Sequence, residues 1–281
     1  MTNSPSGVAP KRLAGRRALV TGASRGIGAA TAQRLAAEGA DVAVTARTAD
    51  SHPTLSGSLR ETTDRLSEFG GKAVAVLADL TDPEERSTIV PRAVEGLGGP
   101  IDILINNAAA AIYQPLIDFP LKRRRLIFEV NVHAPMDLAQ AVLPEMMERG
   151  EGWIVNVSSA TAHLSWPPFQ VGRLGSTTGI YGASKAALNR LTNALAVEVE
   201  SSKIRVNTVE PRSAVMSEGA EVLIGGPLSQ VQVESMEEMV EAIVALCDCP
   251  PERTGLTHVS LDLLAELAVP IHRLDGTPLA G

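Results

Sequence analysis

"TGASRGIGAAT", residues Thr21–Thr31, decides the fold, because it joins an apolar run to a helical segment through a loop rich in glycine. The run before it, "RALVT" (Arg17–Thr21), is typical of a buried strand. Gly22, Gly26 and Gly28 let the backbone turn tightly and approach a ligand where a Cβ would block it. The helix that follows directs its free N–H groups and the positive end of its dipole at that point. This order of strand, loop and helix predicts a binding site for the phosphates of a dinucleotide.

The rest of the chain alternates short β-rich runs with helical segments. Six further strands are predicted, at Asp41–Ala46, Lys72–Asp79, Ile101–Asn106, Trp153–Ser159, Ile204–Val209 and Thr257–Leu263. Several are continuous apolar runs, which is typical of parallel strands covered on both faces. The alternation predicts an α/β fold: a Rossmann-type doubly wound parallel sheet of about seven strands with helices on both faces. We expect a single domain over residues 14–281 after a disordered lead-in at residues 1–13.

Composition limits the classes of partner. The 281 residues carry a net charge of −7 and are 44% hydrophobic, so neither nucleic acid nor an anionic membrane surface is an expected partner. The amino-terminal segment lacks the apolar core of a signal peptide, and no apolar run reaches the length of a membrane span. Five scattered histidines and the pair Cys247 and Cys249 form no ligand pattern, so no metal is expected. The sequence predicts a soluble, cytoplasmic protein.

The segment "GIYGASKAALNRL" (Gly179–Leu191) places Tyr181 one helical turn before Lys185. Residues i and i+4 share a helix face, so the hydroxyl and the ammonium can converge. A free tyrosine has a pKa of about 10 and is a poor base at neutral pH. A nearby cation and the amino-terminal end of the helix dipole both favour the phenolate, so the pair predicts an acid–base group with a lowered pKa. The alternative is a surface pair in which the tyrosine packs and the lysine is solvated.

These motifs together resemble those of the classical short-chain dehydrogenase/reductase family, which has T-G-x-x-x-G-x-G at the glycine loop and Y-x-x-x-K on a later helix. Further matches are "ADL" (Ala78–Leu80), "INNAA" (Ile105–Ala109), Asn131 in "VNVHAP" and "IVNVSS" (Ile154–Ser159). The family usually has glycine where this chain has Ala109. The matches extend from about residue 14 to about residue 211, and their combination is specific where each alone is not.

The resemblance implies an oxidoreductase that interconverts a carbonyl and a secondary or primary alcohol by hydride transfer. Tyr181 would exchange a proton with the substrate oxygen, and Lys185 would hold the nicotinamide ribose. Ser159 would stabilise charge on that oxygen, with Ser158 as the alternative. Asn131 would hold a water that links Lys185 to solvent. The implied cofactor-binding residues are Gly22, Ser24, Arg25, Gly26, Ile27, Gly28, Arg47, Asp79, Leu80, Asn107, Ala108, Ala109, Tyr181, Lys185 and Pro211.

The end of the second predicted strand bears on the choice of cofactor. Folds that bind NAD often have an acidic residue about 20 positions past the glycines, which accepts the ribose 2′-OH. Here Ala46 and Arg47 stand at that point, and Arg25 lies inside the glycine loop. Two guanidiniums can hold a 2′-phosphate through paired hydrogen bonds. We therefore expect NADP(H) in preference to NAD(H), with the alternative that both arginines only face solvent.

The interval between the serine and the tyrosine departs from the family pattern. Tyr181 follows Ser159 by 22 residues, which is longer than usual, and the extra segment holds Trp166 and Phe169. Aromatic residues are only 3% of the chain, so their clustering here is notable. We expect the segment either to border the pocket, favouring an apolar substrate, or to form a surface loop that packs on itself.

The region after the sixth strand departs as well. Pro211 is present, but Arg212 replaces the family's glycine, and Met216 or Ser217 takes the place of a threonine near the carboxamide. We expect residues 212–234 to form a substrate lid. The last residues, "LLAELAVPIHRLDGTPLAG", have no counterpart in the family, and either the pocket or a neighbouring subunit could lie beneath them.

Other functions on the same fold stay open. A non-catalytic dinucleotide sensor would need only the glycine loop, so the intact Ser159, Tyr181 and Lys185 favour an enzyme. An epimerase or a dehydratase could use the same acid–base groups. The resemblance also implies a homo-oligomer, a tetramer or else a dimer, joined through helices near residues 131–147 and 181–200.

Overall fold

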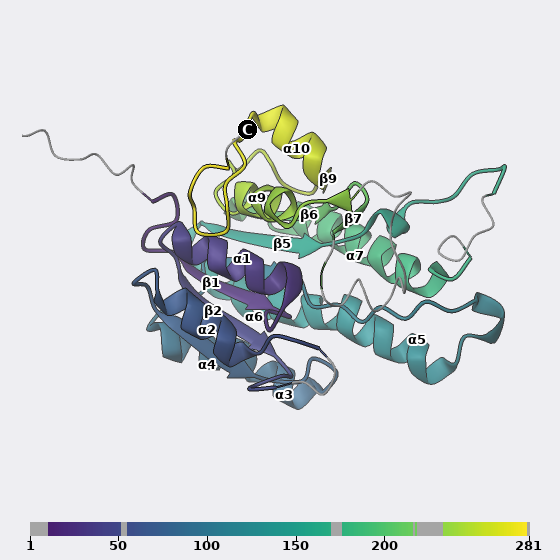
Figure 1. Cartoon of the computed structure of the whole chain (residues 1–281), viewed down its shortest axis with the longest axis horizontal. Helices are drawn as coiled ribbons and strands as arrows, with labels where there is room; N and C mark the ends of the chain where they lie inside the picture. Colours follow the sequence, from purple (N-terminus) through teal and green to yellow (C-terminus); the bar gives the residue numbers. More distant parts are fainter. Residues whose placement is uncertain (1–10, 52–54, 170–175, 216, 218–232, 280–281) are drawn as a thin grey trace, which may run out of the picture.

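The computed structural model describes residues 11–51, 55–169, 176–215, 217 and 233–279. In this part of the chain seven strands form one parallel sheet, in the order β3-β2-β1-β4-β5-β6-β9 (Figure 1). They are β1 (Arg17–Thr21), β2 (Asp41–Ala46), β3 (Ala73–Leu77), β4 (Ile103–Asn106), β5 (Gly152–Val157), β6 (Ile204–Glu210) and β9 (Thr257–Val259). A separate parallel pair is formed by β7 (Ala214–Val215) and β8 (Val233–Glu234).

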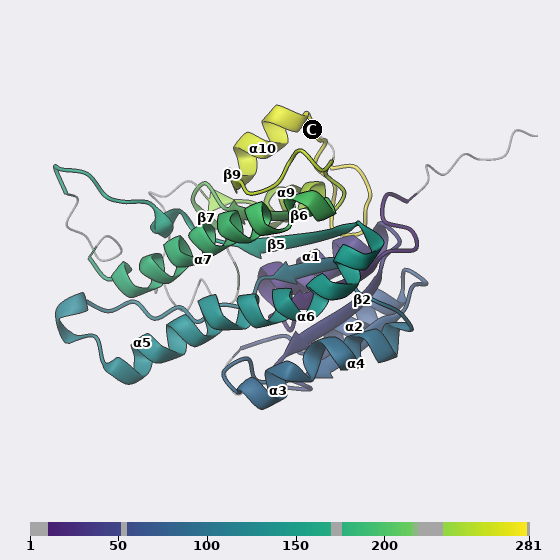
Figure 2. The same cartoon turned by 180° about the vertical axis from the view of Figure 1, so that it is seen from behind.

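Helices cover both faces of this sheet. One face carries α1 (Gly26–Ala37), α2 (Leu59–Ser67) and α9 (Met236–Leu246), which lie in front of the sheet in Figure 1. The opposite face carries α4 (Ile89–Leu97), α6 (Ala134–Arg149) and α7 (Gly179–Glu198), which Figure 2 shows in front. The shorter helices are α3 (Pro83–Ser87), α5 (Leu121–Phe128) and α10 (Ser260–Leu267). This arrangement confirms the predicted Rossmann-type doubly wound sheet in a single domain.

Each face has its own core because neighbouring residues of a strand point to opposite sides of the sheet. On β1, Val20 belongs to the core beneath α1, α2 and α9, together with Leu35 and Ile243. Leu19 belongs to the core beneath α4, α6 and α7. Both residues are fully buried, as the continuous apolar run predicts for a central parallel strand.

The sheet reverses its strand order between β1 and β4, and ligands of such sheets bind at the carboxyl ends of the strands beside this reversal. Two side chains join the ends of these two strands. The Thr21 hydroxyl accepts hydrogen bonds from the backbone N–H groups of Asn107 and Ala108, both at 3.0 Å. The Asn107 amide donates to the carbonyl oxygens of Thr21 at 2.9 Å and Gly22 at 3.3 Å. The glycine loop is therefore fixed to the segment that follows β4.

Several predicted strand ends differ from the structure by one or two residues, and the seventh strand differs most. The seventh strand was expected over residues 257–263, but it ends at Val259 and α10 begins at Ser260. The prediction was wrong there because a short apolar run does not distinguish a strand from a helix. At the amino terminus, residues 1–10 of the predicted lead-in lie outside the described residues, whereas Leu13 is buried in the core and donates its N–H to the Glu38 carbonyl at 2.9 Å.

The carboxyl-terminal tail packs on this chain's own α1 and α9. Glu241 of α9 is completely buried and lies 3.3 Å from Arg12, from Arg34 of α1 and from His272 of the tail. A buried carboxylate needs such partners, since an unpaired charge in the interior is costly. The cluster lies near the carboxyl end of α1, remote from the glycine loop, so these contacts place the tail away from the predicted cofactor site.

Trp153 of β5 lies between two arginines near the amino ends of the strands. The guanidinium carbons of Arg16 and Arg205 lie 4.7 and 4.6 Å from its ring centroid. The indole N–H donates to the Cys249 carbonyl at 3.1 Å. The cysteines Cys247 and Cys249 are both buried as free thiols.

Gly28→Ala should destabilise the protein through a steric overlap. A Cβ at Gly28 would lie 2.4 Å from the Asn107 amide nitrogen and 2.5 Å from the Gly22 carbonyl oxygen. Alanine favours helix by about 0.5–1 kcal/mol over glycine, but overpacking of this kind costs about 1–3 kcal/mol or more, so the overlap should win. Urea-induced unfolding would measure the net loss.

Gly150→Ala is the matched control. Gly150 has a φ of 68° but open space around its Cβ position, so only the left-handed backbone is penalised, by about 1–2 kcal/mol. Gly150→Ala should leave cofactor binding intact, whereas Gly28→Ala should weaken it. A Gly28→Ala protein that is as stable as the wild type and binds cofactor equally well would contradict the packing argument.

Candidate active site

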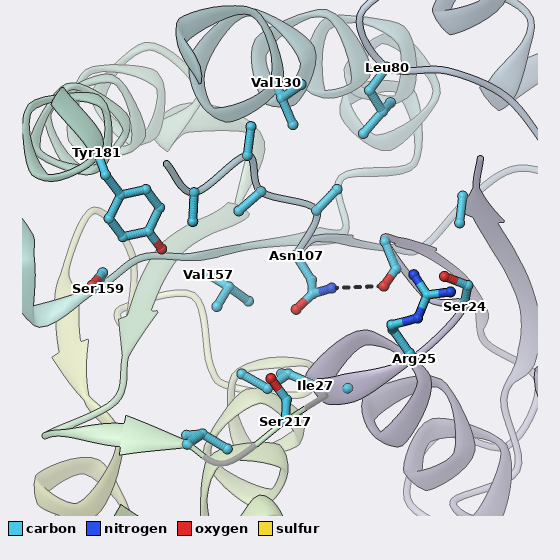
Figure 3. Close-up of a pocket in the computed structure, with 18 of the residues that line it drawn as sticks. Ser24, Arg25, Ile27, Leu80, Asn107, Val130, Val157, Ser159, Tyr181 and Ser217 are labelled. Atoms are coloured by element: carbon cyan, nitrogen blue, oxygen red, sulfur yellow. Dashed lines mark hydrogen bonds between the residues drawn. The ribbon is translucent and has the colours of Figure 1, made fainter. Parts of the chain in front are cut away.

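A cleft of about 1220 Å³ opens at the carboxyl ends of the central strands. Figure 3 shows Ser24 and Arg25 at one end of it and Ser159 and Tyr181 at the other. Most of the residues predicted from the sequence line this one cleft: Gly22, Ser24, Arg25, Gly26, Ile27, Arg47, Leu80, Asn107, Ala108, Ala109, Ser159, Tyr181, Lys185 and Pro211. Three others do not line it: Gly28 and Asn131 are buried, and Asp79 lies beside Arg47.

The glycine loop forms a close-fitting cradle at one end of the cleft. Gly22 has a φ of 65° and Gly26 a φ of 56°, a left-handed backbone that glycine adopts without strain. A Cβ at Gly22 would come within 2.8 Å of the Ala108 Cα. Helix α1 begins at Gly26, and helix amino termini attract phosphate through free N–H groups and the dipole. These residues fit the diphosphate of a dinucleotide.

The two arginines at this end have different surroundings. Arg47 is 68% exposed, and its guanidinium lies 3.7 Å from the Asp79 carboxylate. Arg25 donates from Nε to the Ser56 carbonyl at 2.7 Å and from Nη2 to the Gly57 carbonyl at 2.9 Å. Arg25 therefore binds the loop after β2 to the glycine loop, a contact that the sequence did not predict, while Arg47 is the more accessible of the two cations.

At the other end, Tyr181 and Lys185 project from the first two turns of α7. The Tyr181 hydroxyl points into the cleft on the side of Ser159, which follows β5 (Figure 3). The Ser159 hydroxyl also accepts from the Thr161 N–H at 3.3 Å and from the Thr161 hydroxyl at 3.0 Å. The Lys185 ammonium is buried, donates to the Val157 carbonyl at 2.7 Å and lies 5.8 Å from the Tyr181 ring centroid.

Burial governs the ionisation of both groups. Burial raises the pKa of Tyr181, and the neighbouring Tyr113 raises it further. The Ser159 side chain has the opposite effect and lowers this pKa. Burial lowers the pKa of Lys185 to about 8. The expected lowering of the tyrosine pKa by the lysine is therefore wrong for this structure, because loss of hydration outweighs the attraction of the cation. Tyr181 is a phenol at neutral pH, ready to donate a proton.

Asn131 is held in a π-helical turn, Glu129–His133, between α5 and α6. Its side chain accepts from the Ala110 N–H at 2.7 Å and donates to the Ala110 carbonyl at 3.1 Å and to the Ser184 hydroxyl at 3.0 Å. Ser184 in turn donates to the Tyr181 carbonyl at 2.6 Å. Asn131 thus links the segment after β4 to α7, and π-helical turns often occur at functional sites.

Ser158, the alternative to Ser159, is buried and also lines the cleft. Its hydroxyl oxygen has no hydrogen-bond partner among the protein atoms that the structure describes. The Ser159 hydroxyl, by contrast, accepts hydrogen bonds from the Thr161 N–H and hydroxyl. Of the two serines, Ser159 is the one whose side chain affects the pKa of Tyr181.

Tyr113, the only other tyrosine of the chain, was not among the site residues predicted from the sequence. It lines the cleft beside Tyr181, with ring centroids 5.8 Å apart and an interplanar angle of 61°. Burial raises the pKa of Tyr113, so it too is a phenol at neutral pH. Its scarcity was a usable signal, but no motif or spacing relates it to Tyr181.

The long segment between Ser159 and α7 contributes mainly through its ends. Thr161 and Thr178 line the cleft, whereas Trp166 and Phe169 are 76% and 64% exposed and lie outside its wall. Of the two expectations for this segment, the exposure of Trp166 and Phe169 fits a surface loop, whereas Thr178 at its end fits a border of the pocket. Residues 170–175 of this segment lie outside the described residues.

The segment after β6 also lines the cleft, at Pro211, Ser213, Ala214, Val215 and Ser217. The Arg212 guanidinium contacts the Asp262 carboxylate instead, and the Arg212 N–H donates to Glu234 at 3.0 Å. This bond and the pairing of β7 with β8 join the two ends of the predicted lid. Met216 and residues 218–232, most of that lid, lie outside the described residues.

No helix of the described chain combines the length and the hydropathy that a membrane-spanning segment needs. Over the same residues, no three His, Cys, Asp or Glu side chains gather closely enough to hold a metal ion.

The sequence model of the short chain dehydrogenase family matches residues 16–223, which include the glycine loop, Ser159, Tyr181 and Lys185. The chain belongs to the short-chain dehydrogenase family. It is an NAD(P)-dependent oxidoreductase that acts on CH–OH groups, as the dehydrogenase relatives below also indicate.

Relatives of this short-chain dehydrogenase cover nearly its full length. A short chain dehydrogenase from Pseudocercospora fijiensis is 35% identical over 90% of this chain and 76% of its own. Hydroxysteroid dehydrogenase-like protein 2 from Bos taurus is 31% identical over 91% of this chain. This chain spans only 59% of the length of the bovine protein.

Solved structures agree with the fold. A short chain dehydrogenase from Mycobacterium thermoresistibile superposes with a TM-score of 0.80 at 30% identity, covering 92% of this chain and 89% of its own. A protein from Beutenbergia cavernae superposes with a TM-score of 0.75 at 30% identity, covering 90% of this chain and 97% of its own, and its structure carries NADP at low occupancy.

Lys185→Met should change how the stability of this short-chain dehydrogenase depends on pH. Burial lowers the pKa of Lys185 from 10.5 to about 8, so between these pH values the unfolded chain binds a proton that the folded protein has lost. The free energy of unfolding of the wild type should therefore rise with pH across that window. Below the window the full cost of burying the Lys185 ammonium remains. The variant has no such group, so its stability relative to wild type should fall by about 3 kcal/mol between pH 7 and pH 11, at 1.36 kcal/mol per pKa unit.

Urea-induced unfolding at a series of pH values would measure this difference. Lys122→Met, at an exposed position on α5, controls for the simple removal of a lysine. If Lys185→Met differs from the wild type by the same amount at every pH, the lysine is not buried as an ammonium in the way described.

Proposed function

We propose that this protein is an NADP(H)-dependent oxidoreductase that interconverts an apolar carbonyl compound and the corresponding alcohol. The observation that carries the proposal is that Tyr181, Ser159 and Lys185 line the same cleft that begins at the glycine loop. An acid, a hydrogen-bond donor for the substrate oxygen and a dinucleotide cradle are the parts that such a reaction requires.

The chain's own groups would handle the proton. When bound, the nicotinamide supplies or accepts the hydride. In reduction, the Tyr181 phenol donates its proton to the substrate oxygen as negative charge develops there, and Ser159 stabilises that charge by a hydrogen bond. The phenolate that remains is stabilised by the nearby Lys185 ammonium and regains its proton from solvent. In oxidation the same groups act in reverse, with the phenolate as the base.

The raised pKa of Tyr181 fits reduction at neutral pH, because the group is then already protonated. Oxidation needs the phenolate, so its rate should increase with pH through the alkaline range. A sensor that only binds the dinucleotide would not need a buried phenol and a serine facing the same cleft, and this arrangement favours the enzyme.

NADP(H) is proposed over NAD(H) because of the charge at the adenosine end of the cleft. Arg47 is exposed there, and no acidic residue follows the end of β2 in the position that would accept a ribose 2′-OH. The Beutenbergia cavernae structure with NADP supports the same choice by similarity. Arg25 could join Arg47 on a 2′-phosphate only by exchanging its bonds to Ser56 and Gly57.

We also propose a homo-oligomer, a tetramer or else a dimer. Helices α6 and α7 each expose a large apolar side chain, Met147 and Val197, on the surfaces that would form the interface. Burial of such residues between subunits would remove apolar surface from water.

Tyr181→Phe should retain cofactor binding and lose turnover. Loss of a positioned acid lowers the rate by about 10²–10⁴-fold. The test is NADPH binding followed by fluorescence, then oxidation of NADPH with a panel of aldehydes and ketones. Tyr113→Phe, which removes the other phenol of the cleft, is the matched control and should lose far less. If turnover falls by the same factor in both variants, Tyr181 is not the acid.

Arg47→Asp should reverse the cofactor preference. The change removes a cation from the 2′-phosphate and adds a carboxylate that can accept a 2′-OH, so NADPH should bind about 10–100-fold more weakly while NADH binds no worse. Dissociation constants for both cofactors give the ratio directly. Arg124→Asp, at an exposed position on α5, controls for the change in net charge. A wild type that prefers NADH would refute the proposal at once.

A further inference from the structure

Tyr113 lines the cleft beside Tyr181, with ring centroids 5.8 Å apart. A substrate oxygen that is protonated by Tyr181 lies within about 2.6–3.2 Å of its hydroxyl. The reacting carbon then lies in the cleft that both rings line, so a substituent on that carbon can reach the Tyr113 ring.

The backbone on either side of Tyr113 is fixed. Three residues before it, Ala110 is held by two hydrogen bonds to the Asn131 side chain. One residue after it, the Gln114 N–H donates to the Thr177 carbonyl at 2.9 Å, next to the start of α7. Because both anchors lead to the elements that hold the catalytic tyrosine, the two rings keep a defined relation. A preorganised aromatic wall of this kind selects shape at little cost in entropy.

The distribution of charged residues along the cleft indicates which substrates would be favoured near Tyr113. The charged residues that line the described cleft are Arg25, Arg47, Asp50 and Lys185. The first three lie on the glycine loop and after β2, at the adenosine end. The Lys185 ammonium is engaged by the Val157 carbonyl at 2.7 Å. The other residues that line the described cleft are apolar or uncharged, among them Ala111, Leu126, Val130 and Thr178.

We propose that Tyr113 is a specificity-determining residue that packs against an aromatic ring on the substrate, so that the preferred substrates are uncharged aryl aldehydes or aryl ketones. The inference rests on the proposed carbonyl reduction. A phenyl group can stack offset or edge-to-face on Tyr113, whereas a saturated ring of similar size loses that interaction. The Tyr113 hydroxyl is not needed for this contact, since the ring supplies it.

The test compares acetophenone with cyclohexyl methyl ketone, which differ in whether the ring is aromatic. The wild type with NADPH should prefer acetophenone by about tenfold in kcat/KM. Tyr113→Leu should reduce this ratio to near one, and Tyr113→Phe should preserve it. Leu126→Ala, which enlarges the same cleft without removing an aromatic ring, should change both ketones alike.

Binding separates this inference from the proposed reaction. Ketone binding to the complex with NADP⁺, which holds no hydride to transfer, can be measured by ligand-observed NMR for the wild type and Tyr113→Leu. Tighter binding of acetophenone that disappears in Tyr113→Leu supports the inference even if no turnover is found with NADPH. Reduction of both ketones with equal efficiency, or a preference that survives in Tyr113→Leu, overturns it and leaves the proposed reaction standing.

Discussion

The close approach of α1 to the end of β4, with no side chain between them at Gly28, sets the position of the whole cleft. The Asn107 amide occupies the space that a Cβ would need, and it donates to the backbone of the glycine loop. The glycine loop is thereby fixed to the segment that continues through Ala110 to Tyr113. Through Asn131 and Ser184 the same connection reaches α7 and Tyr181. The proposed cofactor cradle and the proposed acid therefore belong to one hydrogen-bonded framework.

This framework includes a buried charged group, the Lys185 ammonium, that is unfavourable for the stability of the fold. The Lys185 ammonium is buried with a backbone carbonyl as its partner, and burial lowers its pKa to about 8. A methylene-rich side chain at this position would suit the core better. The free energy of folding thus includes an unfavourable contribution from the residue that the chemistry needs, which is a common relation between activity and stability.

The parts that were predictable from the sequence depend on local spacing. Apolar runs located the strands, the glycines located the loop, and the four-residue interval located Tyr181 and Lys185 on one helix face. The parts that were not predictable depend on contacts between distant segments. Tyr113 meets Tyr181 where Gln114 is bonded to Thr177, and Arg25 is engaged by a loop some 30 residues away. The direction of the tyrosine pKa depends on burial, which spacing does not reveal.

The two tryptophans of the chain have opposite surroundings. Trp153 is 4% exposed and is held between two arginines inside the fold, whereas Trp166 is 76% exposed on the segment before α7. The protein therefore carries two intrinsic fluorophores that report separately. Emission from Trp153 follows the integrity of the sheet. Emission from Trp166 is open to a soluble quencher such as iodide, and any event that covers its segment, such as closure over a ligand or contact with another subunit, would be visible without a label.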